Sequence, residues 1–150
     1  MVVILKINNT MRILSRILLL TLFSIGFACL TSAQVLKVKA DAISIKTKSE
    51  YTESWSDWSD WQSVNILITI DSEKQRIKIF SKEDQVYDII QNLGEDYDKD
   101  GDKVWKWLCV NEDGLRCHVR LVKLYSQNGK SQLYVDFSDM KWVYNIYSLD

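Results

Sequence analysis

Three tryptophans stand three residues apart, at Trp55, Trp58 and Trp61, and a Ser-Asp pair separates each from the next. An extended polyproline-type strand repeats every three residues, so this spacing places the indoles on one side of such a strand. Flat aromatic rings in a row can stack on sugar rings and bury a large apolar area. The run predicts a carbohydrate-binding strip. Packing against one end of a sheet and a protein-binding surface are the alternatives, and Trp61 is expected to be the most buried of the three.

The same residues resemble two family patterns. Trp55-Ser56-Asp57-Trp58-Ser59 resembles the WSxWS box of cytokine receptors, and the run to Trp61 is similar to the WxxWxxW strip of thrombospondin type 1 repeats. Both families stack their tryptophans on arginines, and no arginine stands near this run in the sequence. The thrombospondin repeat also needs six cysteines. The resemblance covers seven residues, and we carry over no function from it.

Alternating aspartates could bind a metal. Gly101 stands at the sixth position of a loop that opens like a calcium loop, with carboxylates at Asp96, Asp98, Asp100 and Asp102. The twelfth position is Trp107, where an EF-hand needs a bidentate glutamate, and the residues that follow favour a strand over a helix. The loop therefore predicts a hairpin with solvated carboxylates. A calcium site of another kind is the alternative, and no other cofactor is expected.

No catalytic residues are assigned. Nucleophilic catalysis by serine or cysteine usually needs a histidine base, and His118 is the only histidine. Its neighbours Arg116 and Arg120 place it on a polar outer strand face. The chain also has no phosphate-binding glycine loop and no transition-metal ligand cluster. We predict a binding or interaction domain rather than an enzyme.

The segments between these residues read as strands. They are rich in Val, Ile, Tyr, Trp and Phe, and Gly94, Gly101, Gly114 and Gly129 each lie in a polar break. Val86–Leu93 is compatible with a strand or a short helix. We expect an all-β fold, a single antiparallel up-and-down meander of about seven to eight strands that forms a small barrel or a strongly curved open sheet.

Loop chemistry predicts the register of three hairpins. Pairing Ile70 with Gln75 brings Ile68 opposite Ile77. A three-residue loop closed by Gly114 brings Cys109 opposite Cys117. The same kind of loop closed by Gly129 brings Leu121 opposite Val135 and Val119 opposite Phe137. Together these registers collect one apolar face, formed by Trp105, Trp107, Val119, Leu121, Val135 and Phe137.

Facing cysteines in an exported chain are most simply a disulfide, and we predict that Cys109–Cys117 staples its hairpin. A labile redox pair is one alternative, since disulfides between neighbouring strands are often strained, and free core thiols are another if the register differs.

The first third of the chain predicts export. Met11-Arg12 and Arg16 form a basic start, the run 17–28 is apolar, and small residues end at Ala33, so residues 1–33 read as a cleaved signal peptide. The apolar run is shorter than the ~20 residues that span a bilayer. Lipid attachment at Cys29 is the alternative. Translation could begin at Met1 or Met11.

The residues after the signal, 34–150, are long enough for one domain. All 20 acidic residues remain in them and three of the 19 basic residues are lost, which leaves a net charge of −4. A mildly acidic domain without a basic stripe argues against nucleic-acid binding. From Val64 onward the chain resembles small exported proteins of unknown function from Bacteroidetes-type bacteria, which implies a periplasmic or secreted location and no activity.

These observations predict an exported binding domain. Glycan binding through the tryptophans is the leading version. The alternatives are a barrel that holds a small apolar ligand against Trp105, Trp107 and Phe137, and a module that binds another exported protein. No membrane span is expected after cleavage.

Overall fold

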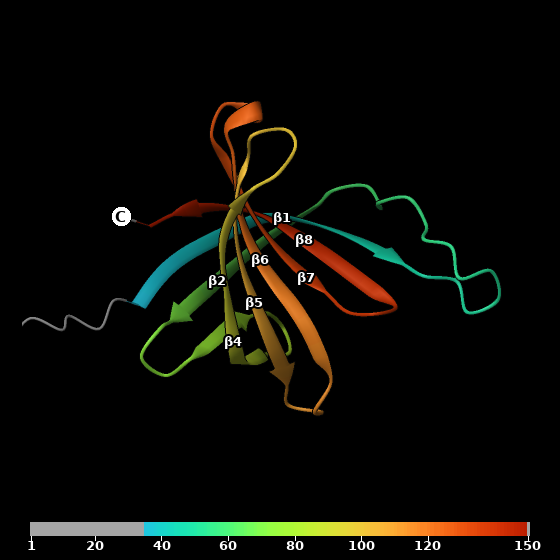
Figure 1. Cartoon of the computed structure of the whole chain (residues 1–150), viewed down its shortest axis with the longest axis horizontal. Helices are drawn as coiled ribbons and strands as arrows, with labels where there is room; N and C mark the ends of the chain where they lie inside the picture. The colour runs from blue at the N-terminus through green and yellow to red at the C-terminus, as the bar shows by residue number, and fades with distance from the viewer. Residues whose placement is uncertain (1–34, 150) are drawn as a thin grey trace, which may run out of the picture. The chain divides into compact units, whose positions relative to one another are not determined.

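Eight antiparallel strands, each hydrogen-bonded to the next in sequence, close into a barrel when the last pairs with the first (Figure 1). The structure is a computed structural model that describes residues 35–149, so the signal peptide, Cys29 and Gln34 lie outside the described residues. The strands are β1 (Val35–Thr47), β2 (Gln62–Asp71), β3 (Arg76–Phe80), β4 (Gln85–Tyr97), β5 (Lys103–Asn111), β6 (Arg116–Leu124), β7 (Lys130–Asp136) and β8 (Met140–Ser148). The expected all-β meander is confirmed, and it is a closed barrel rather than an open sheet.

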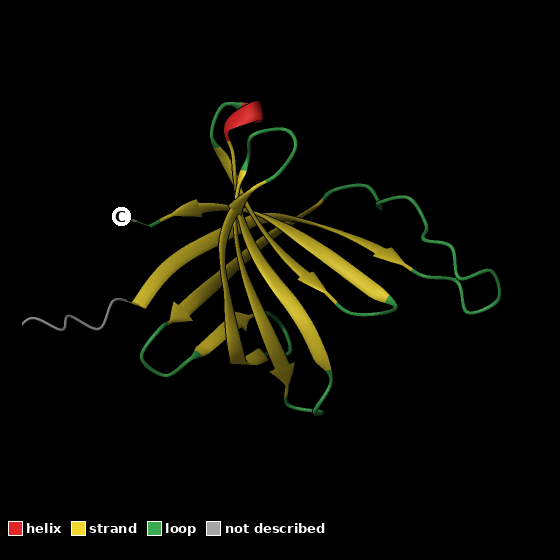
Figure 2. Ribbon diagram, viewed as in Figure 1, coloured by secondary structure: helices red, strands yellow, loops and turns green. Residues whose placement is uncertain are grey.

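Within the described part of the chain, the only helical element is the short turn η1 (Tyr125–Gln127) (Figure 2). The segment 86–93, for which the sequence is compatible with a helix or a strand, is part of β4. Val, Ile and aromatic side chains favour a strand in the first half of β4. The second half is rich in Asn, Gly, Glu and Asp and is extended through its pairing with β5.

The barrel interior is filled by β-branched and aromatic side chains that alternate along the strands. Its most deeply buried members include Ile68, Ile77, Ile79, Val119, Leu133, Val135 and Tyr144. An eight-stranded barrel has an interior just wide enough to be filled in this way or to hold one small ligand. Whether this barrel can hold a ligand therefore depends on the space at its two ends.

The β5–β6 hairpin has the predicted register. Asn111 N–H donates to the Leu115 carbonyl at 3.0 Å and Gly114 N–H to the Asn111 carbonyl at 3.0 Å, with Gly114 at a φ of +79°. Cys109 therefore faces Cys117, and Trp107 faces Val119. Glycine makes this loop because the last of its three residues takes the left-handed conformation.

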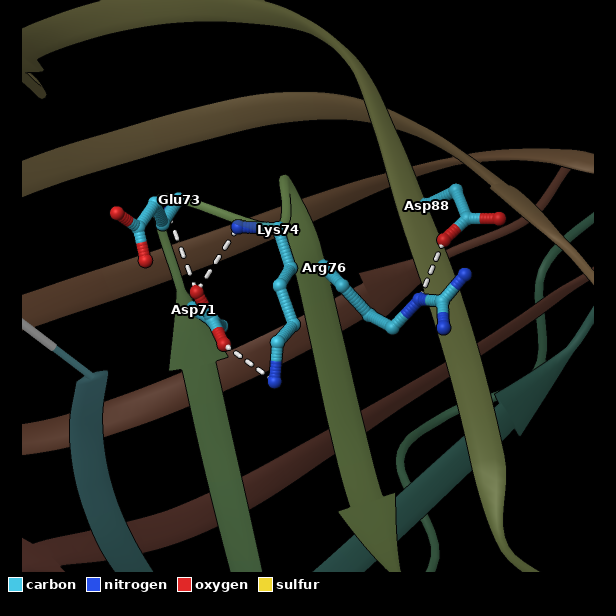
Figure 3. Close-up of polar contacts among 5 residues, drawn as sticks. All are labelled: Asp71, Glu73, Lys74, Arg76 and Asp88. Carbon is cyan, nitrogen blue, oxygen red and sulfur yellow. Dashed lines mark hydrogen bonds and ion pairs between the residues drawn. The ribbon is translucent and has the colours of Figure 1, made fainter. Parts of the chain in front are cut away.

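The β2–β3 register differs from the prediction by two residues, and Ile68 faces Ile79 instead of Ile77. The reason lies at Asp71, whose Oδ1 accepts the N–H groups of Glu73 at 3.1 Å and Lys74 at 2.9 Å (Figure 3). Asp71 thereby stays in the ladder and the loop is 72–75. A shift of two leaves the same side chains on the inner face.

Arg76, at the other side of this loop, faces Asp88 on β4 and donates from Nε to its Oδ1 at 2.7 Å (Figure 3). This exposed ion pair links β3 to β4 next to the β2–β3 loop.

The β6–β7 register also differs by two, and Val119 faces Val135 rather than Phe137. The loop has five residues instead of three, because Tyr125–Gln127 form η1 and Gly129 N–H donates to the Leu124 carbonyl at 2.8 Å. Figure 1 shows this loop beside the β4–β5 loop at the top of the view. Hydrogen bonds from Ser126 to Asp102 join the two loops.

Candidate functional site

The tryptophan run lies outside the barrel, hydrogen-bonded along the end of β1. Ser56 N–H donates to the Thr47 carbonyl at 2.8 Å, and Ser56 Oγ accepts Thr47 N–H at 3.1 Å. Ser59 repeats the arrangement with Ile45, at 2.8 Å and 3.0 Å. Each serine thus supplies both a donor and an acceptor to β1. The three-residue spacing of the sequence therefore repeats the hydrogen bonds to β1 as well as the tryptophans.

Lysines contact the indoles on this outer surface. Lys46 Nζ lies 5.6 Å from the Trp55 ring centroid and 5.1 Å from that of Trp58, and Lys141 Nζ lies 4.6 Å from Trp55. Trp58 also packs edge-on against Tyr134, with ring centroids 6.2 Å apart. These contacts fall within the range of cation–π attraction. A sugar would have to share the Trp55 and Trp58 rings with these neighbours.

The three indoles differ in exposure. Trp55 is half-buried, whereas Trp58 is 40% exposed and Trp61 is 49% exposed. The expectation that Trp61 is the most buried is wrong. The residue precedes β2, where the chain re-enters the barrel, but it is the most exposed of the three. The prediction of carbohydrate binding at these residues stays a prediction.

The acidic loop is a hairpin built like the β5–β6 loop. Asp98 Oδ1 accepts the N–H groups of Asp100 at 2.9 Å and Asp102 at 3.0 Å, as Asn111 Oδ1 does for Asp113 and Leu115. Asp96 Oδ1 accepts Tyr97 N–H at 2.8 Å. The expected hairpin is present, and among residues 35–149 no three His, Cys, Asp or Glu side chains are grouped to hold a metal. Calcium binding stays a prediction.

Asp102 has a separate role, since its carboxylate is buried against the β6–β7 loop. Its Oδ1 accepts Ser126 N–H at 2.8 Å and its Oδ2 accepts Ser126 Oγ–H at 2.7 Å. The hydroxyl donor, then the backbone donor, lowers the pKa of Asp102, against the opposing effect of desolvation. Asp102 therefore ties two hairpins together at one end of the barrel.

The prediction of a Cys109–Cys117 disulfide is wrong, because both residues are free thiols in the barrel core. Their facing positions lie two residues inward from the hydrogen-bonded Asn111–Leu115 pair, so they too form a hydrogen-bonded pair. Such a pair holds its Cβ atoms ~5.5 Å apart, farther than the ~3.5–4.5 Å of a disulfide. Burial raises the pKa of each thiol to about 12. Both act as small core residues.

His118 lies on the outer face of β6, opposite Leu108 and Asp136. Desolvation, and then the positive charge of Lys106, lowers its pKa. This outer position agrees with the predicted polar face.

A cavity of about 560 Å³ opens at the end of the barrel where the β3–β4, β5–β6 and β7–β8 turns meet. Its deeper wall is aromatic, with ring centroids 6.4 Å apart for Tyr87 and Phe137 and 5.4 Å apart for Phe137 and Trp142. Ile43 and Ile45 of β1 complete this wall. The volume lies within the ~300–1,000 Å³ typical of small-molecule sites.

A hydrogen-bonded trio adds polarity to the cavity wall. Tyr87 Oη donates to Gln85 Oε1 at 2.7 Å, and Gln85 Nε2 donates to Tyr144 Oη at 3.4 Å. Burial raises the pKa of both tyrosines, so their hydroxyls stay protonated. Trp142 Nε1 is buried and has no hydrogen-bond partner among the described residues. A buried donor without an acceptor costs about 1–3 kcal/mol.

The rim of this cavity is acidic. The β3–β4 turn contributes Lys82, Glu83 and Asp84, and the β5–β6 turn contributes Glu112 and Asp113. Asp84 is paired with Lys78 at 2.8 Å. The rim thus has more carboxylates than ammonium groups.

The sequence predicted only some of the residues that line this cavity. Phe137 lines it as expected of an interior residue. Trp107 is partly buried and packs against the core, and Trp105 lines a smaller cavity of about 200 Å³ at the opposite end. The missed residues are Gln85, Tyr87, Trp142 and Tyr144. Alternation of Trp142 and Tyr144 along the last strand was the available signal, since alternate residues share a face.

Comparison with known proteins gives no relative, because no family model, no curated protein and no solved structure matches the chain. Within residues 35–149, no helix has the length and apolar character needed to cross a bilayer.

Proposed function

We propose that this chain is an exported binding protein that holds a small, flat, largely apolar molecule in the cavity at the turn-lined end of its barrel. The observation that carries the proposal is the 560 Å³ cavity with its aromatic wall. The export signal expected in residues 1–33 supports a role outside the cytoplasm. The proposal needs no catalytic group, cofactor or calcium.

The chemistry of the wall supports the class of ligand. Phe137 and Trp142 offer ring surface, which favours aromatic or alicyclic molecules through apolar burial and ring stacking. The Tyr87–Gln85–Tyr144 trio offers polar atoms for orientation, since binding pockets combine apolar walls with a few placed polar groups. The acidic rim favours a neutral or cationic molecule.

The tryptophan strip is a weaker candidate for a primary site. The rings of Trp55 and Trp58 already contact Lys46, Lys141 and Tyr134. Glycan binding there remains a separate prediction, for which Trp61 offers the most open ring.

A fluorescent probe tests the cavity. N-phenyl-1-naphthylamine is neutral, apolar and bright only when shielded from water, and we expect it to bind the wild-type protein with one site. Ile45→Trp adds a large ring to the cavity wall at a position that is 36% exposed, so the barrel should tolerate it. We expect this variant to lose at least about tenfold in affinity, since blocking the cavity removes most of the buried contact.

Val35→Trp is the matched control. It adds the same ring at a 38%-exposed position that lines neither the barrel-end cavity nor the smaller cavity at the opposite end. It should leave probe affinity unchanged. Equal affinity in wild type and Ile45→Trp would place the probe elsewhere and reject the cavity as the site. Absence of binding across a panel of neutral aromatic and alicyclic compounds would reject the proposed ligand class.

A further inference from the structure

A groove of about 660 Å³ crosses the outer surface of β5–β8 and adjoins the barrel-end cavity at Phe137, which lines both. Its charged and titratable lining residues are Lys106, Arg116, His118, Arg120, Asp136 and Lys141. Four of these are cations at neutral pH and one is a carboxylate. Residues 34–150 are acidic as a whole, so positive charge is concentrated on this surface.

The single carboxylate among these residues, that of Asp136, already forms an ion pair with Arg120. Arg120 donates from Nε to Asp136 Oδ2 at 2.6 Å and from Nη2 to Oδ1 at 3.3 Å, while its guanidinium lies 4.3 Å from the Tyr134 ring centroid. The Arg120 guanidinium is therefore held by both carboxylate oxygens of Asp136 and by the Tyr134 ring. The ion pair neutralises one cation of the groove, and the other three form no ion pair within residues 35–149.

Lys106, Arg116 and Lys141 form no ion pair with any residue that the structure describes. Lys141 stands opposite Asp136 and Lys46 in the sheet, and its ammonium group lies against the Trp55 ring. Lys106 also lines a neighbouring hollow with Glu95, Asp96 and Asp98. Like charges gathered without counter-charges repel each other, which costs stability. The pKa of His118 is lowered first by desolvation and then by the positive charge of Lys106, against the opposing effect of Asp136. An anionic partner would relieve this repulsion.

The tryptophan layer borders the groove. Lys141 lies in the groove and against Trp55, and Tyr134, the ring under Arg120, also contacts Trp58. Uncompensated cations therefore stand beside aromatic rings of which Trp58 is 40% exposed. Acid groups can pair with the cations while a sugar ring packs on the indole.

The unpaired cations are spread across the groove, with Lys106 on β5, Arg116 on β6 and Lys141 on β8. Arg116 lies four residues along β6 from Arg120, the direct partner of Lys106, so the cations are separated along the strands as well as across them. This spread suits a long polymer that carries many anionic groups better than a single small anion. We propose that this groove binds an acidic polysaccharide, whose carboxylate or sulfate groups contact Lys106, Arg116 and Lys141 while one sugar ring packs against Trp58.

The test measures binding of the protein to polygalacturonate, dextran sulfate and uncharged dextran. We expect binding to at least one of the two acidic polymers and none to dextran. Stronger binding to polygalacturonate would identify carboxylates as the recognised groups, and stronger binding to dextran sulfate would identify sulfates. The variant Lys106→Gln/Arg116→Gln should bind the preferred polymer about tenfold more weakly, through loss of charge-assisted hydrogen bonds.

Lys37→Gln/Lys130→Gln is the charge-matched control. It removes the same two positive charges from exposed positions outside the groove, and should change the affinity less than threefold. Equal losses in the two double variants would show general attraction to polyanions and overturn the proposal. Equal affinity for single-stranded oligothymidylate would overturn it as well, as would absence of binding to both acidic polymers. Thermal melting verifies that both variants fold.

Discussion

Lys46 on β1 and Lys141 on β8 face each other directly across the seam that closes the barrel, and both ammonium groups lie against the indole of Trp55. Like charges in directly opposed positions destabilise a sheet. Here the negative ring face attracts both cations and offsets their repulsion. The tryptophan run therefore stabilises the closure of the barrel, whatever else it binds.

We expect Trp55→Ala to lower the free energy of unfolding by about 2 kcal/mol, through two lost cation–π contacts and the unscreened lysine pair. Lys141→Gln should cost less by itself and should partly rescue Trp55→Ala. Urea denaturation of the two single variants and the double variant gives the coupling energy. Strictly additive effects would show that the indole and Lys141 act independently.

Gly114 tests the loop chemistry that fixes the β5–β6 register. A Cβ at this position meets no atom within 4 Å, so Gly114→Ala is opposed only by the φ of +79°. We expect a loss of about 1–2 kcal/mol, the cost of the left-handed conformation for an ordinary residue. Gly114→Asn should cost less because asparagine tolerates this conformation. Equal stability of the alanine variant and wild type, measured in urea, would contradict this account.

This loop also shows why part of the fold was predictable. The Asn111-Glu112-Asp113-Gly114 segment specifies one turn, and every pair of the β5–β6 hairpin follows from it. The β2–β3 and β6–β7 registers differ from the prediction by two. Asp71 accepts the N–H groups of Glu73 and Lys74 at the first loop, and η1 with the Gly129–Leu124 hydrogen bond lengthens the second. Because a shift of two preserves the inner face, the interior was largely correct even where the pairing was not.

The candidate sites were less predictable because they depend on distant residues. Tyr87 and Tyr144 meet through Gln85 only after the barrel closes, and the partner of Asp102 is 24 residues away. The lysines beside Trp55 come from β1 and β8, at opposite ends of the domain's sequence. The families that these tryptophans resemble stack them on arginines, whereas lysines lie against the rings here.

The free cysteines predict slow chemical labelling. Cys109 and Cys117 are 0% and 3% exposed, and their raised pKa keeps both thiols protonated. We expect iodoacetamide at pH 8 to leave the native protein unmodified and to label two thiols of residues 35–149 in denaturant, because the thiolate is the nucleophile. A mass two hydrogens lower, with neither thiol labelled after unfolding, would instead reveal a disulfide.

Asp102 predicts an acid-dependent loss of stability. Its pKa is lowered from 3.8 in the folded protein, so its contribution is present above that value and is lost as the pH falls through the lower, folded pKa. We expect Asp102→Asn to melt at a lower temperature than wild type at pH 7, with the difference shrinking below about pH 4. Melting curves between pH 7 and pH 2 measure this.

Asp100→Asn is the neighbouring control for that experiment. Its carboxylate accepts no hydrogen bond from the residues the structure describes, so the substitution should change the free energy of unfolding by less than about 0.5 kcal/mol. A gap between wild type and Asp102→Asn that stays constant down to pH 2 would show that the carboxylate charge contributes nothing.

The acidic rim predicts charge selectivity in the barrel-end cavity. Glu83, Glu112 and Asp113 line the rim with Lys82 as the only cation there, so a cationic ligand should bind more tightly than an anionic one of equal size. We expect 1-naphthylmethylamine to bind several-fold more tightly than 1-naphthylacetate at low salt, with the difference reduced in 1 M NaCl by screening. Glu83→Gln/Glu112→Gln should reduce the preference while leaving affinity for neutral N-phenyl-1-naphthylamine unchanged. Isothermal titration calorimetry measures each affinity, and a preference for the anion would show that the rim charges do not govern entry.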